Sequence, residues 1–426
     1  MPGSSSRRQF LQTASLAMAS PLILPGRARG MLDANDRIQL GFIGVGTMGR
    51  GHLNRFLGHK DVQVVAVCDV VKERREAAQK TVDDRYATDK DKPTAKVCRS
   101  YVDFRELLQQ PDVDAVVIST PDHWHAVMCV MAADAKKDIY CEKPLTHSIA
   151  EGRKIVQAVA RNQRIFQTGS QQRSEYSNRF RLAVELVRNQ RLGPVDSIRI
   201  GVGGPPKPCD LPEQPIPDGT DWDLWLGPAA NRPYNEVLCP KGIHKHFPAW
   251  RLYREFAGGG LADMGAHHFD IAQWALNMDT SGPIWVEPPN EGETGLKFTY
   301  ANGVVMRHGG PADCVFEGPK GTIHASRGSL DSLPANIIKK PIEEHDFHVY
   351  SSNDHIRNWL DCIITRSTPI CPAETGHRTA TVCHLANIGY QLRRKLNWNP
   401  ETEQFVNDTE ANRLLDPPKR APWVIR

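Results

Sequence analysis

Residue types and spacing point to two kinds of chemistry in this chain. Gly44, Gly46 and Gly49 form a G-x-G-x-x-G turn, which could hold a diphosphate. Lys143, together with Asp263 and His267, offers groups suited to proton transfer. Asp263 and His267 are four residues apart on one face of a predicted helix, so their side chains can meet. A desolvated ammonium beside a hydroxyl can stabilise a developing alkoxide, and an imidazole titrates near neutrality. The first set indicates dinucleotide binding, and the second indicates general acid–base chemistry.

The glycine turn is predicted to join a strand to a helix. An apolar run at residues 38–43 precedes it, and Leu53, Phe56 and Leu57 follow at helical spacing. Glycines permit the tight turn, the approach of a pyrophosphate to the backbone and the packing of helix on strand. The expected cofactor contacts in the turn are Gly44, Gly46, Thr47, Met48 and Gly49. The alternative is a glycine-rich turn that binds no ligand.

A second apolar run, residues 62–67, is predicted to be the neighbouring strand, and Asp69 follows its end. A carboxylate at this place could accept hydrogen bonds from an adenosine ribose and would repel a 2′-phosphate, which predicts NAD as the cofactor. Lys72, Arg74 and Arg75 follow closely, so NADP stays possible.

Strands and helices alternate through residue 171, as in a doubly wound parallel sheet. The further strand-like runs are 113–119, 138–141 and 165–168, and the helix-like runs are 72–80, 102–108, 126–135 and 148–160, the last with a capping box of Ser148 and Glu151. The polar stretch 81–96 is predicted to be a surface loop. Residues 120–125 and 142–145 follow the ends of two strands, where open parallel sheets bind ligands.

The second half is predicted to be a separate α/β unit. Helices are expected at 178–189, 261–276, 355–365 and 380–395, and strands at 195–202, 296–300 and 304–307. Short intervals between turns favour antiparallel pairing, and the Pro/Gly-rich stretch 203–223 is not expected to hold regular structure. We divide the chain into a leader and linker (1–35), a Rossmann dinucleotide-binding domain (36–171), a second α/β domain (172–398) and a tail (399–426).

Charge is balanced outside the first thirty residues. The formal charge is +4, and the four arginines before Met31 account for it, which leaves 49 basic and 49 acidic residues. A neutral body offers no electrostatic attraction for nucleic acid or an anionic membrane surface.

Arg7-Arg8, followed by an apolar segment at 16–24, predicts a twin-arginine export signal and a periplasmic location. The alternative is a disordered basic N-terminus, and no membrane-spanning segment is predicted for the mature protein.

The cysteines and histidines do not form a metal-binding pattern. Ten cysteines occur without a C-x-x-C pair, so we expect buried small hydrophobes, with a disulfide between Cys362 and Cys371 possible after export. Histidines recur as H-x-H and H-H, but without a supporting framework of Cys, Asp or Glu ligands. No metal is predicted.

Three motifs, taken in order, resemble a known family. TPDHWH (120–125), EKPL (142–145) and GGGLADMGAHHFD (258–270) are spaced as in the glucose-fructose oxidoreductase, inositol dehydrogenase and rhizopine-catabolism (Gfo/Idh/MocA) family, and the similarity covers nearly all of residues 38–395. The resemblance implies a Rossmann domain followed by an α/β domain with a large open, mainly antiparallel sheet. It also implies homodimers or homotetramers assembled through that sheet.

The resemblance implies roles for single residues. Lys143 is expected to contact the cofactor and the substrate oxygen, and His267 to take the hydroxyl proton while hydride leaves to the nicotinamide. The alternatives are a surface lysine and a solvated polar helix face carrying Asp263 and His267. Further cofactor contacts are expected at Thr120, Pro121, His125 and Glu142. Candidate substrate contacts are Arg173, Trp250, Arg251 and Tyr253, because arginines and aromatic faces suit a polyhydroxylated ring; for Trp250, core packing is the alternative.

These observations predict an exported NAD(P)-dependent oxidoreductase acting on a secondary alcohol or ketone of a sugar, glycoside or cyclitol. An NAD-dependent glycosidase that oxidises its sugar transiently is the main alternative, and a cofactor-binding protein without catalysis is the third. No free pool of nicotinamide cofactor is expected outside the cytoplasm. We therefore expect the dinucleotide to be retained and recycled in place, under a cover such as residues 81–96 or a partner subunit's tail.

Overall fold

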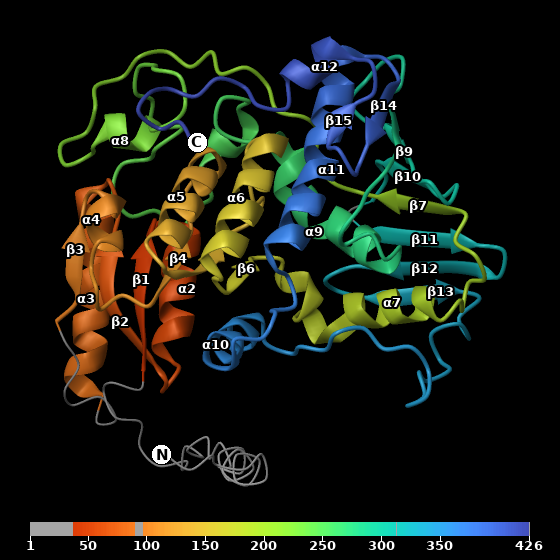
Figure 1. The fold of residues 1–426 in the computed structure, drawn as a ribbon, viewed down its shortest axis with the longest axis horizontal. Coiled ribbons are helices and arrows are strands. Elements are labelled where there is room, and N and C mark those ends of the chain that lie inside the picture. Colours follow the sequence, from red (N-terminus) through yellow and green to blue (C-terminus); the bar gives the residue numbers. More distant parts are fainter. Residues whose placement is uncertain (1–36, 90–96, 312, 426) are drawn as a thin grey trace, which may run out of the picture.

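Two α/β domains lie side by side, each built on one sheet, with helices α9 (Gly259–Ala275) and α11 (Ala373–Leu392) between the sheets (Figure 1). This computed structural model describes residues 37–89, 97–311 and 313–425. The twin-arginine sequence falls outside the described residues. Within the described ranges, no helix combines the length and the apolar character needed to cross a bilayer.

The first domain has a six-stranded sheet in which every strand pair is parallel, in the order β3-β2-β1-β4-β5-β6. The strands are β1 (Ile38–Ile43), β2 (Val62–Cys68), β3 (Arg99–Tyr101), β4 (Ala115–Ile118), β5 (Asp138–Cys141) and β6 (Phe166–Thr168). The connecting helices are α2 (Thr47–Leu57), α3 (Lys72–Thr88), α4 (Phe104–Leu108), α5 (Asp122–Asp134) and α6 (Ile149–Asn162). This is the doubly wound order, in which the reversal between β1 and β4 opens a crevice for a dinucleotide. The predicted Rossmann domain is confirmed.

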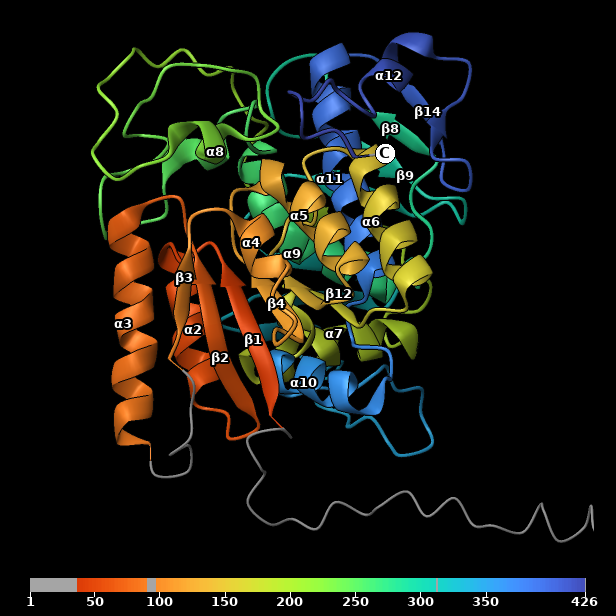
Figure 2. The ribbon, with the colours of Figure 1, turned by 60° about the vertical axis from the view of Figure 1, so that its left-hand side comes forward.

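Helix α3 corrects one expectation. It continues to Thr88 because Val82 and Tyr86 stay buried, and the backbone N–H of Val64 donates to the Tyr86 hydroxyl at 2.7 Å. Residues 81–88 are therefore helical, and α3 runs from the carboxyl edge of the sheet toward the opposite end (Figure 2). They cannot cover the nucleotide crevice, and residues 90–96 are outside the described part of the chain.

Two helices of the first domain begin two or more residues away from where the sequence predicts. The short strand β3 was not predicted, and the helix expected at residue 102 begins at Phe104, after it. Helix α5 begins at Asp122 rather than at residue 126, so Asp122, His123 and His125 lie on its first turns, where all three are buried.

The second domain has a mixed nine-stranded sheet in the order β13-β12-β11-β7-β10-β9-β8-β14-β15, in which only β7 and β10 pair in parallel among the described strands. Its strands are β7 (Ser197–Ile200), β8 (Trp285–Glu287), β9 (Lys297–Thr299), β10 (Val305–His308), β11 (Cys314–Gly318), β12 (Gly321–Ala325), β13 (Leu330–Leu333), β14 (Leu396–Asn399) and β15 (Gln404–Phe405). Its other helices are α7 (Arg179–Arg188), α8 (Trp222–Leu226), α10 (His355–Thr365) and α12 (Thr409–Arg413). The expected fold class is confirmed.

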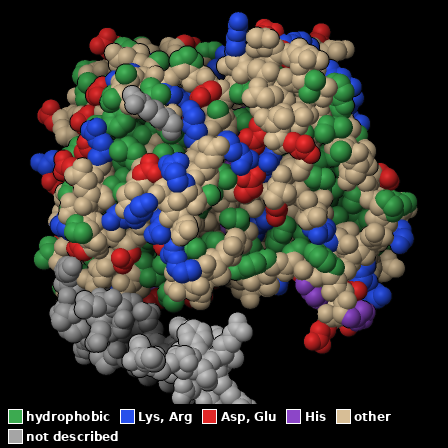
Figure 3. All heavy atoms as spheres, viewed as in Figure 1, with side chains coloured by type: hydrophobic (Ala, Val, Ile, Leu, Met, Phe, Trp, Pro, Cys, Tyr) green, Lys and Arg blue, Asp and Glu red, His purple; other side chains and the backbone are tan. Residues whose placement is uncertain are grey.

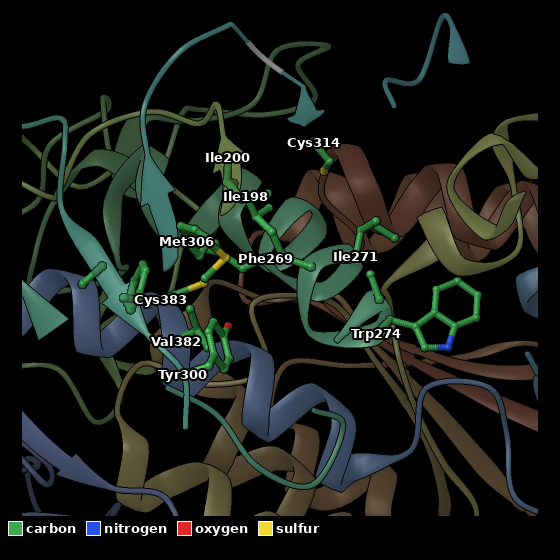
Figure 4. Close-up of a cluster of buried hydrophobic side chains, with 14 of the residues drawn as sticks. Ile198, Ile200, Phe269, Ile271, Trp274, Tyr300, Met306, Cys314, Val382 and Cys383 are labelled. Atoms are coloured by element: carbon green, nitrogen blue, oxygen red, sulfur yellow. The ribbon is translucent and has the colours of Figure 1, made fainter. Parts of the chain in front are cut away.

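One core holds α9 and α11 on this sheet. Ile198 and Ile200 of β7 meet Phe269 of α9 and Val382 and Cys383 of α11, and all five are wholly buried (Figure 4). The other side of α9, which carries the candidate catalytic residues, is thereby held toward the first domain.

The C-terminal segment, predicted to wrap a neighbour or the chain's own surface, packs on the chain's own surface. Strand β15 extends the second sheet, and the chain then returns to the first domain, where Trp423 packs edge-on against Trp124 with ring centroids 4.7 Å apart. Arg420 donates to the carbonyl oxygen of Gly227 at 2.8 Å. These contacts join the C-terminus to the region above the carboxyl ends of the parallel strands.

All ten cysteines are free thiols, and nine are buried, so Cys362 and Cys371 form no disulfide here. On the face drawn in Figure 3, acidic and basic side chains are interspersed. This matches the balanced charge of the sequence.

Candidate active site

The glycine turn has the shape that a diphosphate requires. Gly44 has φ +81°, and a Cβ on it would lie 2.8 Å from the carbonyl oxygen of Ser119. A Cβ on Gly49 would lie 2.0 Å from the carbonyl oxygen of Gly44, so both positions demand glycine. At Gly46, the N-cap of α2, no described atom lies within 4 Å of a Cβ position. That open space at a helix N-terminus fits a pyrophosphate.

Asp69 lies at the end of β2, beside the turn. Its Oδ2 accepts from the backbone N–H of Val45 at 2.9 Å, and its Oδ1 accepts from the N–H of Val71 at 2.9 Å. The carboxylate thus fixes the turn and stands where an adenosine ribose is expected.

A segment of the second domain, residues 240–251, crosses the glycine turn, and we call it the strap. Arg74 of α3 donates from Nε to the carbonyl oxygen of Gly242 at 2.9 Å. Thr47 donates from Oγ1 to the carbonyl oxygen of His246 at 3.0 Å, and the Arg50 guanidinium donates to that of His244. The strap is therefore tied to both helices that flank the nucleotide crevice. It was not predicted from the sequence, and it replaces the helical residues 81–88 as the candidate cover.

A channel runs between the strap and the glycine turn. The predicted contacts Thr47, Met48, Asp69, Thr120, Pro121, Trp250 and Arg251 all line it. The channel encloses about 100 Å³. Ligand pockets commonly measure about 300–1,000 Å³. The lining residues fit a dinucleotide, which needs more space than the channel encloses in this structure.

Lys143 is not a surface lysine. It follows β5, and its side chain is 13% exposed. Its Nζ lies 2.6 Å from Oδ1 and 2.9 Å from the carbonyl oxygen of Asp263, and Arg251 Nε lies 3.7 Å from the same Oδ1. Burial alone would raise the pKa of Asp263, but the Lys143 ammonium outweighs it and holds this pKa below its usual value. Asp263 is thus a carboxylate between two cations.

His267 lies one turn further along α9 and is 5% exposed. Its Nδ1 is buried and has no hydrogen-bond partner among the described residues. Burial, reinforced by the Lys143 ammonium, lowers the pKa of His267 well below its usual value, so the ring is neutral near pH 7. The expected contact between His267 and Asp263 is not made, because Asp263 pairs with Lys143 instead. His268 faces elsewhere, with Nδ1 3.3 Å from the carbonyl oxygen of Gly201.

Sequence reasoning missed Asp122, the first residue of α5. Its side chain is buried beside Asp263, Lys143 and Arg251. Burial, with the nearby Asp263 carboxylate, raises the pKa of Asp122 to about 8, so it carries a proton near neutrality. The signal was present in TPDHWH, as a carboxylate directly after the end of a strand.

Two of the candidate substrate contacts are engaged elsewhere. Arg173 is 1% exposed, and its Nη2 lies 2.7 Å from carboxylate oxygens of both Asp270 and Asp279. Tyr253 packs in a buried cluster with Trp225 and other apolar side chains. Trp250 and Arg251 do face the channel, with the Arg251 guanidinium 4.2 Å from a Trp250 ring centroid.

Two residues that were expected to contact the cofactor are instead hydrogen-bonded within the protein, away from the channel. The ring nitrogens of His125 lie 2.8 and 3.0 Å from two backbone carbonyl oxygens. Glu142 is buried, and its Oε1 lies 2.7 Å from His52 Nε2 and accepts from Gln171 Nε2 at 2.8 Å. Neither side chain lines the channel. Across the described ranges, no three His, Cys, Asp or Glu side chains gather as a metal site.

A glycine-turn Rossmann domain and a lysine–carboxylate–histidine set supplied across two domains define a nicotinamide-dependent oxidoreductase class. Family models agree: residues 38–170 match "Oxidoreductase family, NAD-binding Rossmann fold", and residues 207–425 match "Oxidoreductase family, C-terminal alpha/beta domain". The chain belongs to this family, Gfo/Idh/MocA.

Curated relatives align over part of their length. Inositol 2-dehydrogenase of Salmonella typhimurium is 33% identical over 138 residues, 32% of this chain and 38% of that protein. A glycosyl hydrolase family 109 protein of Shewanella pealeana is 30% identical over 179 residues, 37% of this chain and 38% of that protein. The chain thus spans less than two-fifths of each.

Solved structures show the same fold at low identity. The aldose-aldose oxidoreductase from Caulobacter crescentus, complexed with glycerol, has a TM-score of 0.57 at 18% identity, over 85% of this chain and 99% of that one. The WlbA dehydrogenase from Bordetella pertussis, in complex with NADH and UDP-GlcNAcA, has a TM-score of 0.60 at 15% identity, over 85% and 99%.

Proposed function

We propose that this protein transfers hydride between a bound nicotinamide and a secondary alcohol or ketone of a sugar, glycoside or cyclitol. The observation that carries the proposal is the Lys143–Asp263 ion pair at 2.6 Å beside a neutral His267, at the carboxyl edge of a sheet whose glycine turn fits a dinucleotide. The nicotinamide, when bound, supplies the hydride acceptor or donor. The likeness to inositol dehydrogenases supports a small polyhydroxylated substrate.

The chain's own side chains handle the proton and the charge. His267 is neutral, so it can accept a hydroxyl proton. The Lys143 ammonium stabilises the developing alkoxide, and Asp263 holds that ammonium in place. Arg251, stacked over Trp250 at the channel wall, offers donors and a flat face to a sugar ring.

A second candidate function is an NAD-dependent glycosidase. Elimination of an aglycone needs an acid that protonates the leaving oxygen, and Asp122 is a buried carboxylic acid beside the Lys143–Asp263 pair. The likeness to glycosyl hydrolase family 109 proteins supports this alternative.

Absorbance of the bound nicotinamide separates the candidates. NAD-loaded protein is mixed with free sugars, cyclitols and aryl glycosides. A lasting rise in NADH absorbance with a free sugar or cyclitol supports the oxidoreductase. Release of the aglycone without lasting absorbance change supports the glycosidase, and neither signal with any compound contradicts both.

We also propose that the protein is exported through its Arg7-Arg8 signal with the dinucleotide already bound. The bound cofactor is then recycled in place, either by reduction of a second carbonyl substrate or within one sequence of oxidation, elimination and reduction. Retention through purification requires nanomolar binding, about −12 kcal/mol. The strap, tied to α2 and α3, supplies the cover that such slow release needs. Denatured protein is assayed for released NAD(H). Protein that purifies without cofactor and needs added NAD contradicts this proposal.

Location and assembly are tested separately. Replacing Arg7 and Arg8 with lysine should move the protein from the periplasmic to the cytoplasmic fraction.

We propose a homodimer or homotetramer formed through the open face of the second sheet, and light scattering of the mature protein measures its mass. A monomeric mass contradicts the assembly.

A further inference from the structure

A second cavity lies where the start of α6, the second half of α11 and residues 414–419 meet. It encloses about 460 Å³. It shares no lining residue with the channel under the strap. The space is large enough for a ring-sized ligand, since pockets of about 300–1,000 Å³ are typical of small-molecule sites.

The wall includes polar atoms that lack partners. Ser148, the N-cap of α6, is 3% exposed, and its Oγ makes no hydrogen bond with any described residue. The predicted capping box is therefore not formed: Glu151 accepts from the N–H of His147 at 3.2 Å and faces Lys419 at 3.1 Å. His123, 2% exposed and also in the wall, has an unpartnered Nδ1. Leaving such buried groups unpaired costs about 1–3 kcal/mol each.

Two further imidazoles in the wall have a defined tautomer. His147 Nε2 lies 2.7 Å from the carbonyl oxygen of Arg254, and His384 Nε2 lies 2.9 Å from that of Thr146. A carbonyl oxygen can only accept, so each Nε2 carries the proton. Burial lowers the pKa of each ring to about 4, so both are neutral near pH 7. Each Nδ1 is therefore an acceptor for a donating ligand group.

The charges around the cavity cancel. Lys419 is paired with Glu151, and the other cations of the wall, Arg254 and Arg393, are matched by two carboxylates, Glu255 and Glu293. An anionic ligand would meet those carboxylates. The rest of the wall includes two amide side chains, Asn387 and Gln391, and apolar surface from Ile149, Ile388, Leu414 and several prolines.

A matching ligand is neutral, has hydroxyls that both donate and accept, and has apolar ring faces. We propose that this cavity is a binding site for a neutral sugar or polyol, separate from the reacting site. Ser148 Oγ and the imidazoles of His147 and His384 would hold the hydroxyl groups. The proposal does not depend on the proposed hydride transfer.

The test measures binding of three probes, myo-inositol, D-glucose and maltose, to NAD-loaded protein by saturation-transfer NMR and calorimetry. Ser148→Ala removes the unpartnered hydroxyl, and Leu414→Trp fills the cavity from its wall. Leu333→Trp, at a side chain that is 72% exposed on β13, is the matched control. Thermal melting checks that each variant is folded.

At least one probe should bind the wild type and the Leu333→Trp variant. Ser148→Ala should weaken binding at this cavity about tenfold, and Leu414→Trp should abolish it there, which leaves only the binding of a probe that is also a substrate of the reacting site. A purely structural Ser148 predicts the reverse, since loss of an unpaired buried hydroxyl leaves stability equal or higher and binding unchanged. Absence of binding up to about 50 mM, far above a millimolar dissociation constant, overturns the proposal. So does binding that both cavity variants leave unchanged, which would place the probe in the reacting site.

Discussion

Arg173 donates from Nε and Nη2 to the two carboxylate oxygens of Asp270, at 2.8 and 2.7 Å, and both side chains are buried. The pair joins the turn that follows the first domain to α9, three residues beyond His267. Arg173 also stacks over the Trp274 ring at 4.8 Å. This contact fixes the orientation in which α9 presents Asp263 and His267 to Lys143.

Arg173→Ala should lower the free energy of unfolding by about 3–5 kcal/mol, because Asp270 stays buried without its counterion. Urea denaturation of cofactor-free protein measures the change. Arg161→Ala, which breaks an exposed pair with Asp134, is the control and should cost less than about 1 kcal/mol. Equal losses in the two variants would contradict the bracing role.

Lys143→Ala and His267→Ala should each lower turnover by roughly a hundredfold or more, the scale of a positioned acid or base, and leave NAD binding largely intact. Steady-state kinetics and calorimetry measure the two effects. Lys297→Ala, in an exposed pair with Glu287, serves as the control. Near-normal turnover of His267→Ala at neutral pH would exclude it as the proton acceptor.

Asp122 should make stability depend on pH. The pKa of Asp122 in the folded state is raised to about 8, above the value of an unfolded aspartate. Its contribution to the free energy of unfolding is therefore fully present below about pH 4 and is lost as the pH rises through about 8. Asp122→Asn should therefore be more stable than wild type near pH 8, and the difference should shrink toward pH 4. Denaturation at a series of pH values tests this, with the exposed Asp134→Asn as control. A difference that does not vary with pH would show that Asp122 is ionised in the folded state.

Asp69 should favour NAD over NADP, because its carboxylate repels a ribose 2′-phosphate. Calorimetry on cofactor-stripped protein should give tighter binding of NAD. Asp69→Ser should reduce the difference in affinity between NAD and NADP. The variant also loses the carboxylate that accepts from the Val45 and Val71 N–H groups. Equal or tighter binding of NADP by the wild type would refute the preference.

Gly242→Ala should loosen the strap. Gly242 has φ +61°, and a Cβ on it would lie 2.3 Å from Glu73 Oε2 on α3. We expect NADH to dissociate about tenfold faster, since affinity is tuned mostly through dissociation. Gly303→Ala is the matched control, because φ there is also positive, at +86°, while no described atom lies within 4 Å of its Cβ position. Stopped-flow release of fluorescent NADH measures the dissociation rate in the two variants. Equal NADH dissociation rates in Gly242→Ala and Gly303→Ala would exclude the strap as the cover.

The sequence by itself determined the Rossmann half and its ligand class. Apolar periodicity and glycine spacing are local features of the sequence. A strand followed by Gly44, Gly46 and a helix is specific for dinucleotide binding. The order of motifs around Lys143, Asp263 and His267 also placed the chain in its family, later matched by the family models.

Only the tertiary structure decided which of these side chains are partners. Asp263 was expected to meet His267, its helical neighbour, but pairs with Lys143, 120 residues away in the sequence. Arg173 is held by Asp270, the strap crosses Thr47, and Asp122 becomes a buried acid. Each of these outcomes depends on how α9 and the strap pack against the first domain. Packing between distant segments, with the burial and charge pairing it imposes, leaves no period or spacing in the sequence.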